Sequence, residues 1–131
     1  GLEKVKTVGG AYLCVGGLPK KDIDHAQKVV ECALEMMEYI ESHPSAWKLR
    51  IGIHTGPVVA GIVGKKKFAY DIWGDAVNTS ARMEQMSEAG AINISKATYK
   101  IIRDDYICDY RGKIKAKGKG ALDMYFVKGR L

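Results

Sequence analysis

A stripe of apolar residues at helical spacing, between residues 22 and 42, most constrains the fold of this chain. Asp22 precedes the stripe as a candidate N-cap, and the segment Ser42-His43-Pro44-Ser45 ends it. Residues that recur every three or four positions lie on one face of a helix, which must bury that face against another element. The stripe consists of Ile23, Ala26, Val29, Val30, Ala33, Leu34, Met37 and Ile40.

β-prone runs surround this helix, mostly in pairs. Residues 2–8 and 12–15 are separated by Gly9-Gly10, a strong hairpin signal. Two shorter helices are expected, one capped by Asp75 and one running from the cap Ser95 to about Arg103. Further strands are expected over residues 48–54, 58–63, 68–73, 91–94, 106–116 and 124–127. This order predicts an α+β fold, a ferredoxin-like antiparallel or mixed sheet with helices packed on one side.

Composition favours one soluble globular domain. The chain has 131 residues, 47% of them apolar and 27% charged, and its longest apolar runs are too short to span a bilayer. Three widely spaced cysteines, without a CxxC pair, argue against a disulfide framework or zinc site and fit a reducing cytosol. The net charge of +6 favours an anionic partner. We therefore predict a cytoplasmic location, with membrane attachment only through regions outside this chain.

Asn78 and Arg82 are the residues that best indicate chemistry. Four residues apart on a predicted helix, they lie one turn apart on the same face. An amide that orients a reacting oxygen, beside a cation that neutralises phosphate charge, makes a plausible phosphoryl-transfer site. Taken singly, Asn78 is more often a capping residue and Arg82 a solvated helix arginine. No Walker-type GxxxxGK[ST] and no GxGxxG after a strand is present.

Four segments, in order, carry a family resemblance over nearly the whole chain. They are EKVKTVGGAY at residues 3–12, RIGIHTGPVVAG at 50–61, DIWGDAVNTSARME at 71–84, and residues 112–126 with their KGKG turn. Together they are similar to the signature segments of the class III nucleotide cyclases. The resemblance implies a cyclase catalytic domain of the adenylyl type, which converts ATP into 3′,5′-cyclic AMP and pyrophosphate.

The resemblance also assigns roles to residues. Asn78, Arg82 and Lys117 would be catalytic, stabilising the transition state and countering phosphate charge. Lys6 and Asp71, with the adjacent Ile72, would bind adenine; guanylyl members carry glutamate and cysteine at the positions of Lys6 and Asp71, so ATP is the expected substrate. A wrong base would leave buried polar groups unpaired.

The metal site is where the sequence departs from the family. The family holds two Mg²⁺ or Mn²⁺ ions with two aspartates, which two-metal phosphoryl transfer requires. One aspartate belongs to a segment upstream of this chain, and the other position is occupied by Gly10. We therefore expect residues 1–131 to form a single, partial catalytic domain, N-terminally truncated, that lacks the first strand and helices.

The expected partner is a second cyclase domain, in a homodimer or heterodimer, that completes the active site. The chain keeps the base-binding and transition-state half, so alone it is predicted to be inactive. A non-catalytic nucleotide-binding or dimerisation domain is the main alternative, and Gly10 favours it. An RNA-binding α+β module would explain the positive charge, but Tyr12, Tyr70 and Tyr125 are too scattered for an aromatic binding strand, and we expect no nucleic-acid partner.

Overall fold

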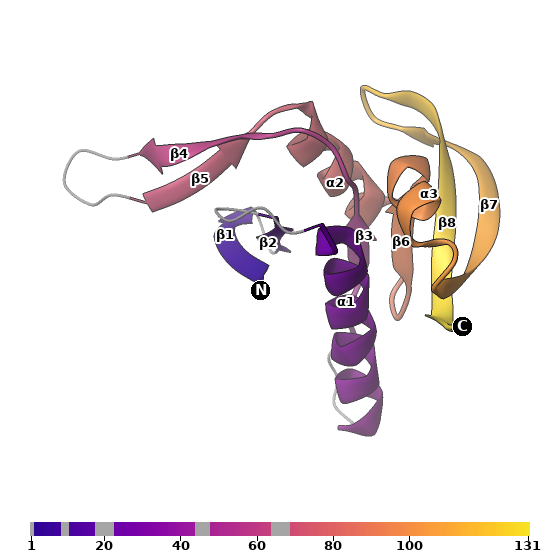
Figure 1. Ribbon diagram of the computed structural model, residues 1–131. Helices are drawn as coiled ribbons and strands as arrows, with labels where there is room; N and C mark the ends of the chain where they lie inside the picture. The colour runs from indigo at the N-terminus through magenta and orange to yellow at the C-terminus, as the bar shows by residue number, and fades with distance from the viewer. Residues whose placement is uncertain (1, 9–10, 18–22, 44–47, 64–68) are drawn as a thin grey trace.

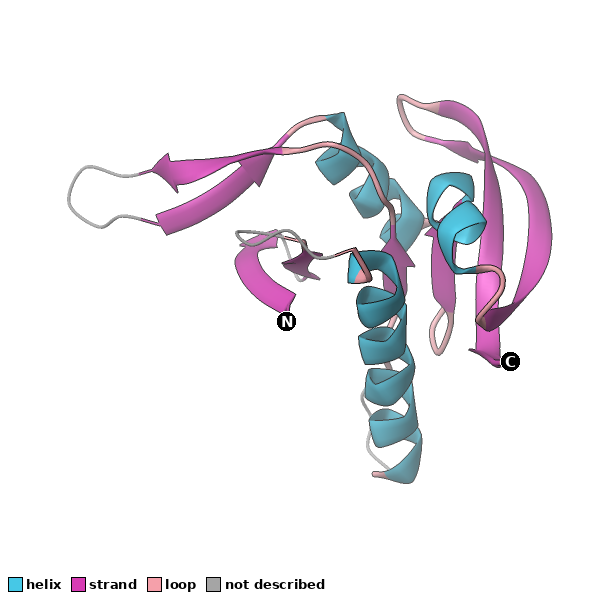
Figure 2. Cartoon of the chain, viewed as in Figure 1, coloured by secondary structure: helices cyan, strands magenta, loops and turns pink. Residues whose placement is uncertain are grey.

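The computed structural model describes residues 2–8, 11–17, 23–43, 48–63 and 69–131. These residues form eight strands and three helices in the predicted order (Figures 1 and 2). The predicted hairpin turn, Gly9-Gly10, lies outside the described residues. The elements are β1 Leu2–Val8, β2 Ala11–Gly16, α1 His25–Ser42, β3 Ile51–Ile53, β4 Val59–Val63, β5 Ala69–Trp73, α2 Asp75–Gln85, β6 Ile92–Ser95, α3 Lys96–Ile102, β7 Tyr106–Ala116 and β8 Gly120–Arg130.

The central sheet has four strands in the order β3-β6-β8-β7. β3 pairs parallel with β6, and the remaining pairs are antiparallel, which confirms the predicted mixed sheet. β1 with β2, and β4 with β5, form separate two-stranded antiparallel sheets. Figure 1 shows β4 and β5 projecting away from the central sheet. No helix in the described part of the chain has the length and apolar character needed to cross a membrane.

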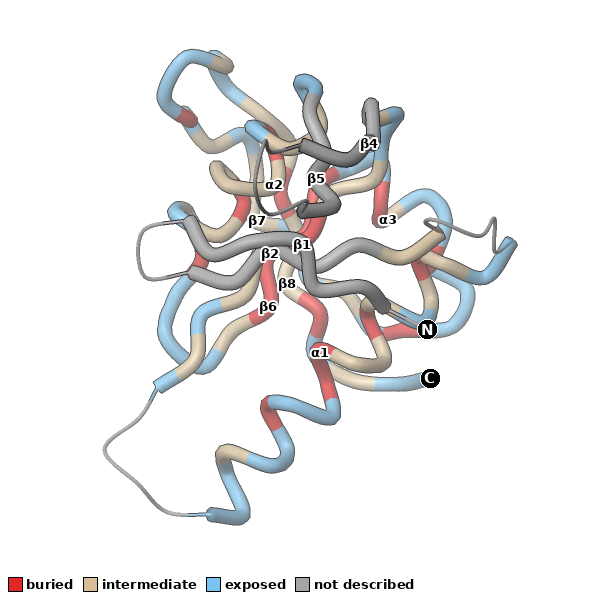
Figure 3. Tube along the Cα trace, turned by 90° about the vertical axis from the view of Figure 1, so that its left-hand side faces the viewer, coloured by how far each residue is buried: buried red, intermediate tan, exposed pale blue. Residues whose placement is uncertain are grey.

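The main core lies between one face of the sheet and helices α1 and α3. The predicted apolar stripe supplies much of it, because Val30 and its neighbours on α1 are buried against β3 and β6 (Figure 3). Ile23 is an exception and is 92% exposed. The reason is that α1 begins later than predicted, with Asp24 and not Asp22 as N-cap. The buried members are Ala26, Val30, Ala33, Leu34, Met37, Ile53, Ile92, Ile94, Ile102, Tyr106 and Val127.

Helix α2 packs on the opposite face, so the helices do not all lie on one side as the sequence predicted. The alternation within β6 shows the two faces: Ile92 and Ile94 join the main core, whereas the amide of the fully buried Asn93 donates to the carbonyl oxygen of Met83 on α2 at 2.9 Å. Met83 also packs with Met124 and Ala116 in a second core cluster. The sheet is therefore covered by helices on both faces.

Gly52 on β3 lets α2 approach the sheet closely. A Cβ atom at this position would lie 1.9 Å from the backbone nitrogen of Glu84 and 2.3 Å from the carbonyl carbon of Met83. No side chain fits such a contact, so glycine is required here. The position of α2, which carries Asn78 and Arg82, therefore requires a residue without a side chain at position 52.

The β7–β8 hairpin runs the full length of both strands. β7 has the predicted bounds, whereas β8 extends beyond the predicted residues 124–127 because it pairs with β7 from Gly120 to Arg130. β3 is shorter than the predicted strand over residues 48–54. At the turn, Gly118 and Gly120 have φ values of +75° and +71°, a region that favours glycine. The turn therefore presents Lys117 and Lys119 on either side of Gly118.

Candidate active site

Helix α2 carries the two residues from which the chemistry was predicted. Asn78 and Arg82 both lie within Asp75–Gln85, one turn apart, as the sequence predicted. The N-cap, however, is Gly74, and Asp75 is the first helical residue. Gly74 has a φ of +129°, which residues with a Cβ rarely adopt. Asn78 is exposed and Arg82 is half-buried, so both are within reach of a ligand.

The Arg82 guanidinium contacts the β7–β8 turn. Its Nε donates to the carbonyl oxygen of Lys117 at 2.9 Å, and its Nη1 donates to Oε1 of Gln85 at 2.8 Å. Nη2 has no partner among the described residues. The side chain of Lys117 is exposed. The structure thus brings Arg82 to the backbone of Lys117, a residue 35 positions away in the sequence.

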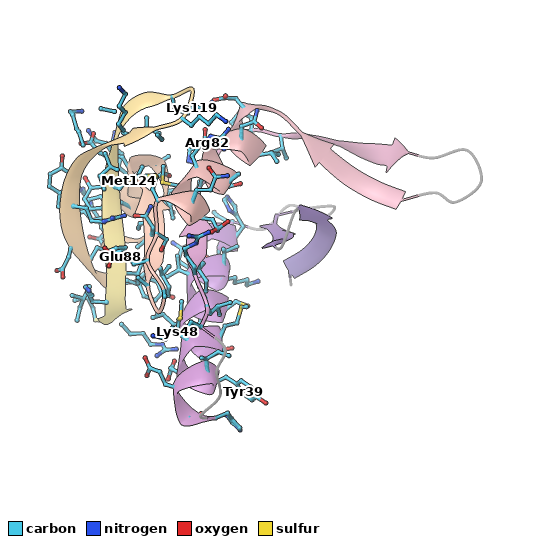
Figure 4. The ribbon with its side chains drawn as sticks, turned by 180° about the vertical axis from the view of Figure 1, so that it is seen from behind. Tyr39, Lys48, Arg82, Glu88, Lys119 and Met124 are labelled. Atoms are coloured by element: carbon cyan, nitrogen blue, oxygen red, sulfur yellow. The ribbon has the colours of Figure 1, made fainter. Side chains whose placement is uncertain are left out.

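A second contact joins the same turn to the start of α2. The ammonium of Lys119 pairs with Oδ1 of Asp75. Lys119 and Arg82 lie at the same end of the molecule, where α2 meets the β7–β8 turn (Figure 4). The Lys119 side chain is only 19% exposed, in contrast with its neighbour Lys117. The two lysines of the turn therefore occupy different environments.

His54 lies beside this contact. Its Nδ1 is 2.7 Å from Oγ of Ser95, the residue that caps α3. Burial, and then the positive charge of Lys119, lower the pKa of His54 below its ordinary value. A neutral imidazole at neutral pH suits a structural hydrogen bond between His54 and Ser95.

The predicted adenine-binding residues are placed by their strands. Lys6 lies on β1, opposite Leu13, and Asp71 and Ile72 lie on β5, opposite Gly61 and Ala60. β1 and β5 contact each other although they belong to different sheets. The strands that carry Lys6 and Asp71 are therefore adjacent, whereas the side chains of Lys6, Asp71 and Ile72 lie outside what the structure describes.

The described residues of this chain do not fit a two-metal site. Within the described ranges, nowhere do three or more His, Cys, Asp or Glu side chains gather in a way that could hold a metal ion. Gly10, which the resemblance assigns to the family's aspartate position, lies outside the described residues, and a glycine has no ligating side chain.

Two structural partners of the site were missed from the sequence. Asn93, within the apolar run Ile92–Ile94, joins α2 to the sheet, and its Oδ1 accepts from Nη1 of Arg111 at 2.9 Å. A lone amide in an apolar strand was the available signal. The pairing of Lys119 with Asp75 spans 44 residues, and no local pattern indicates it.

A family model described as the adenylate and guanylate cyclase catalytic domain matches residues 1–129. Among curated proteins, an adenylate cyclase of Mycobacterium tuberculosis is 40% identical over 134 residues, covering 99% of this chain. The chain spans only 30% of the length of that relative. Guanylyl cyclases of other organisms match over similar stretches.

Solved structures show the same similarity. The guanylate cyclase domain of RhGC from Catenaria anguillulae, in complex with GTP, superposes with a TM-score of 0.94 at 38% identity. It is matched over 99% of this chain and 74% of its own. A guanylyl cyclase domain from Blastocladiella emersonii, described as a non-canonical dimer, gives a TM-score of 0.89 at 35% identity, covering 99% of this chain and 73% of its own.

Proposed function

The chain belongs to the family of adenylate and guanylate cyclase catalytic domains, and from this premise we propose that it forms half of an active site that converts ATP into 3′,5′-cyclic AMP and pyrophosphate. Residues 1–131 would be one partial catalytic domain. Cyclases of both specificities are among its relatives, so the preference for ATP rests on this chain's own residues.

The contact between Arg82 and the Lys117 turn carries the proposal. In the reaction, the ribose 3′-oxygen attacks the α-phosphorus, and the bond from that phosphorus to the pyrophosphate oxygen breaks. Arg82 Nη2 and the Lys117 ammonium would face the charge that develops on the leaving phosphates, because fixed cations stabilise such charge without reorganising. The Asn78 amide, one turn earlier on α2, would orient the attacking ribose oxygen.

The preference for adenine rests on Lys6 and Asp71. A lysine donates to the N1 acceptor of adenine, and an aspartate accepts from its 6-amino group; guanine offers the opposite pattern at these atoms. The contact between β1 and β5 supports this pairing, because it places the two residues on neighbouring strands.

A second cyclase domain must complete the site. A similar guanylyl cyclase domain forms a dimer, described as non-canonical, which supports such a partner. Gly10 supports it as well, since a glycine offers no carboxylate to a metal ion. We expect no cyclic nucleotide from this chain alone. The second candidate function is that of a non-catalytic partner domain, which the glycine at position 10 also favours.

A mixing experiment tests the proposal. The chain would be combined with a cyclase domain that supplies both metal aspartates but carries alanine at its own Asn and Arg positions, and both cyclic nucleotides would be measured with Mg²⁺ or Mn²⁺. We expect cyclic AMP from the mixture only. Arg82→Ala in this chain should lower the rate by roughly a hundredfold or more.

Specificity is tested in the same mixture. Lys6→Glu combined with Asp71→Cys should shift the preference from ATP towards GTP, whereas Lys4→Glu, on the same strand, serves as a matched control. A mixture that forms no product, although the partner domain is active with its own intact copy, would favour the non-catalytic alternative. Product with an unchanged preference in the double variant would refute the adenine assignment alone.

A further inference from the structure

We propose that Lys119 and Asp75 act as a positioning pair, which holds the β7–β8 turn against the start of α2 so that Lys117 and Arg82 face the same triphosphate. The pair would not touch the nucleotide itself. This inference rests on the proposed cyclase function, because it concerns how the two phosphate-binding cations are oriented.

The two lysines of the turn differ in their surroundings. Lys119 is largely buried and forms an ion pair with Asp75, whereas Lys117 is exposed. The Lys119 ammonium is engaged by the Asp75 carboxylate, and the neighbouring His54, with its lowered pKa, adds no competing positive charge at neutral pH. Lys117 is therefore the lysine of this turn that is available to a phosphate.

Two tethers fix the turn along α2. Asp75 is the first residue of the helix, and Arg82 lies near its end. With a rise of 1.5 Å per residue, the two attachment points are about 10 Å apart along the helix axis. One tether would leave the turn able to swing about that contact. Two tethers determine its direction, and with it the position of Lys117.

Removing the negative charge of Asp75 has opposite expected effects under two hypotheses: that Asp75 positions the turn, and that only electrostatic attraction of the nucleotide matters. A carboxylate near a triphosphate repels it, so Asp75→Asn should improve nucleotide binding if electrostatic attraction alone matters. If Asp75 acts by holding the turn, the same change should lower the rate. A displacement of about 1 Å in a catalytic group can cost roughly a hundredfold, and we expect a loss of about tenfold or more in kcat, with KM changed much less.

The test uses Asp75→Asn, Lys119→Gln and the exchanged pair Asp75→Lys with Lys119→Asp. Lys115→Gln is the matched control, because Lys115 is an exposed lysine on the same hairpin. The first readout, on the chain alone, is amide hydrogen exchange at the turn, where the Lys119 amide donates to the carbonyl oxygen of Ala116 at 3.0 Å. Both single variants should exchange faster there, and the exchanged pair should recover protection.

The second readout is kcat and KM for ATP in the mixture with a metal-supplying partner. Faster turn exchange together with lower kcat in Asp75→Asn supports the positioning role. Unchanged exchange, or a kcat equal to or above that of the parent, overturns it, as does a Lys119→Gln variant that raises KM while exchange is unaffected. If no mixture forms cyclic nucleotide, the cyclase function fails, whereas the exchange measurement still decides whether the pair holds the turn.

Discussion

Replacing Gly52 by alanine should push α2 away from the sheet that supports it. The new Cβ atom would lie 1.9 Å from the backbone nitrogen of Glu84. Ordinary van der Waals contact begins at 3.4 Å, so the helix must retreat by about 1.5 Å. Backbone atoms cannot rotate out of the way as a flexible side chain would, and the shift must therefore be taken by the whole helix.

The cost has two parts. Inserting a methyl group into a packed contact costs typically 1–3 kcal/mol, and occasionally more when backbone must move. A retreat of that size also breaks the 2.9 Å hydrogen bond from Asn93 to the Met83 carbonyl, which adds about 1 kcal/mol or more. We expect Gly52→Ala to lower the free energy of unfolding by about 2–4 kcal/mol, a large fraction of the stability of a small domain.

Urea unfolding of the variant and the parent, compared by linear extrapolation, measures this difference. Gly129→Ala is the matched control, because a Cβ atom there meets nothing within 4 Å, and its stability should stay within about 0.5 kcal/mol of the parent. A Gly52→Ala variant that loses less than about 1 kcal/mol would refute the argument that this glycine sets the position of α2.

Three further changes test other parts of the framework. Gly74→Ala should cost about 1–3 kcal/mol in urea unfolding, because the φ of +129° at the N-cap of α2 is strained for a residue with a Cβ; a neutral result would contradict that strain. Asn93→Ala should cost about 2–3 kcal/mol in the same assay, since it leaves Arg111 and the Met83 carbonyl without their buried partner; an unchanged midpoint would oppose this. Because the folded-state pKa of His54 is lowered, its contribution to stability should be present above about pH 6.5 and decline as the pH falls through the folded-state pKa. Between about pH 8 and pH 5, the free energy of unfolding should therefore fall less steeply in His54→Gln than in the parent. Parallel curves of this free energy against pH would exclude a contribution from His54.

The order of the elements was predictable because its signals are local. The apolar stripe of α1 and the glycines beside Lys119 act within a few residues. Ser95 behaves as the predicted cap of α3, because its Oγ accepts from the Thr98 amide at 3.4 Å. Asn78 and Arg82 were likewise placed correctly on one helix, since a spacing of four residues has the same geometry in any helix.

The remainder depends on contacts between distant segments. The side of the sheet that α2 covers follows from Gly52 and Asn93, which meet the helix only after folding. The bonds from Arg82 to the Lys117 carbonyl and from Lys119 to Asp75 join residues 35 and 44 positions apart. Periodicity cannot detect such pairs, so the sequence predicted the candidate cations but not what orients them. The roles of Asn78, Arg82, Lys117, Lys6 and Asp71 in catalysis stay predictions.

Arg82 is ordered before any nucleotide arrives. An arginine side chain carries about 2 kcal/mol of rotamer entropy, and hydrogen bonds from Nε and Nη1 already restrict it in the folded chain. Part of the entropy loss that a phosphate contact would otherwise require therefore occurs on folding, not on binding. Nη2 is the one nitrogen of this guanidinium without a partner among the described residues, so an incoming phosphate would contact Arg82 there. A contact confined to this nitrogen would let one arginine discriminate between phosphates by position as well as by charge.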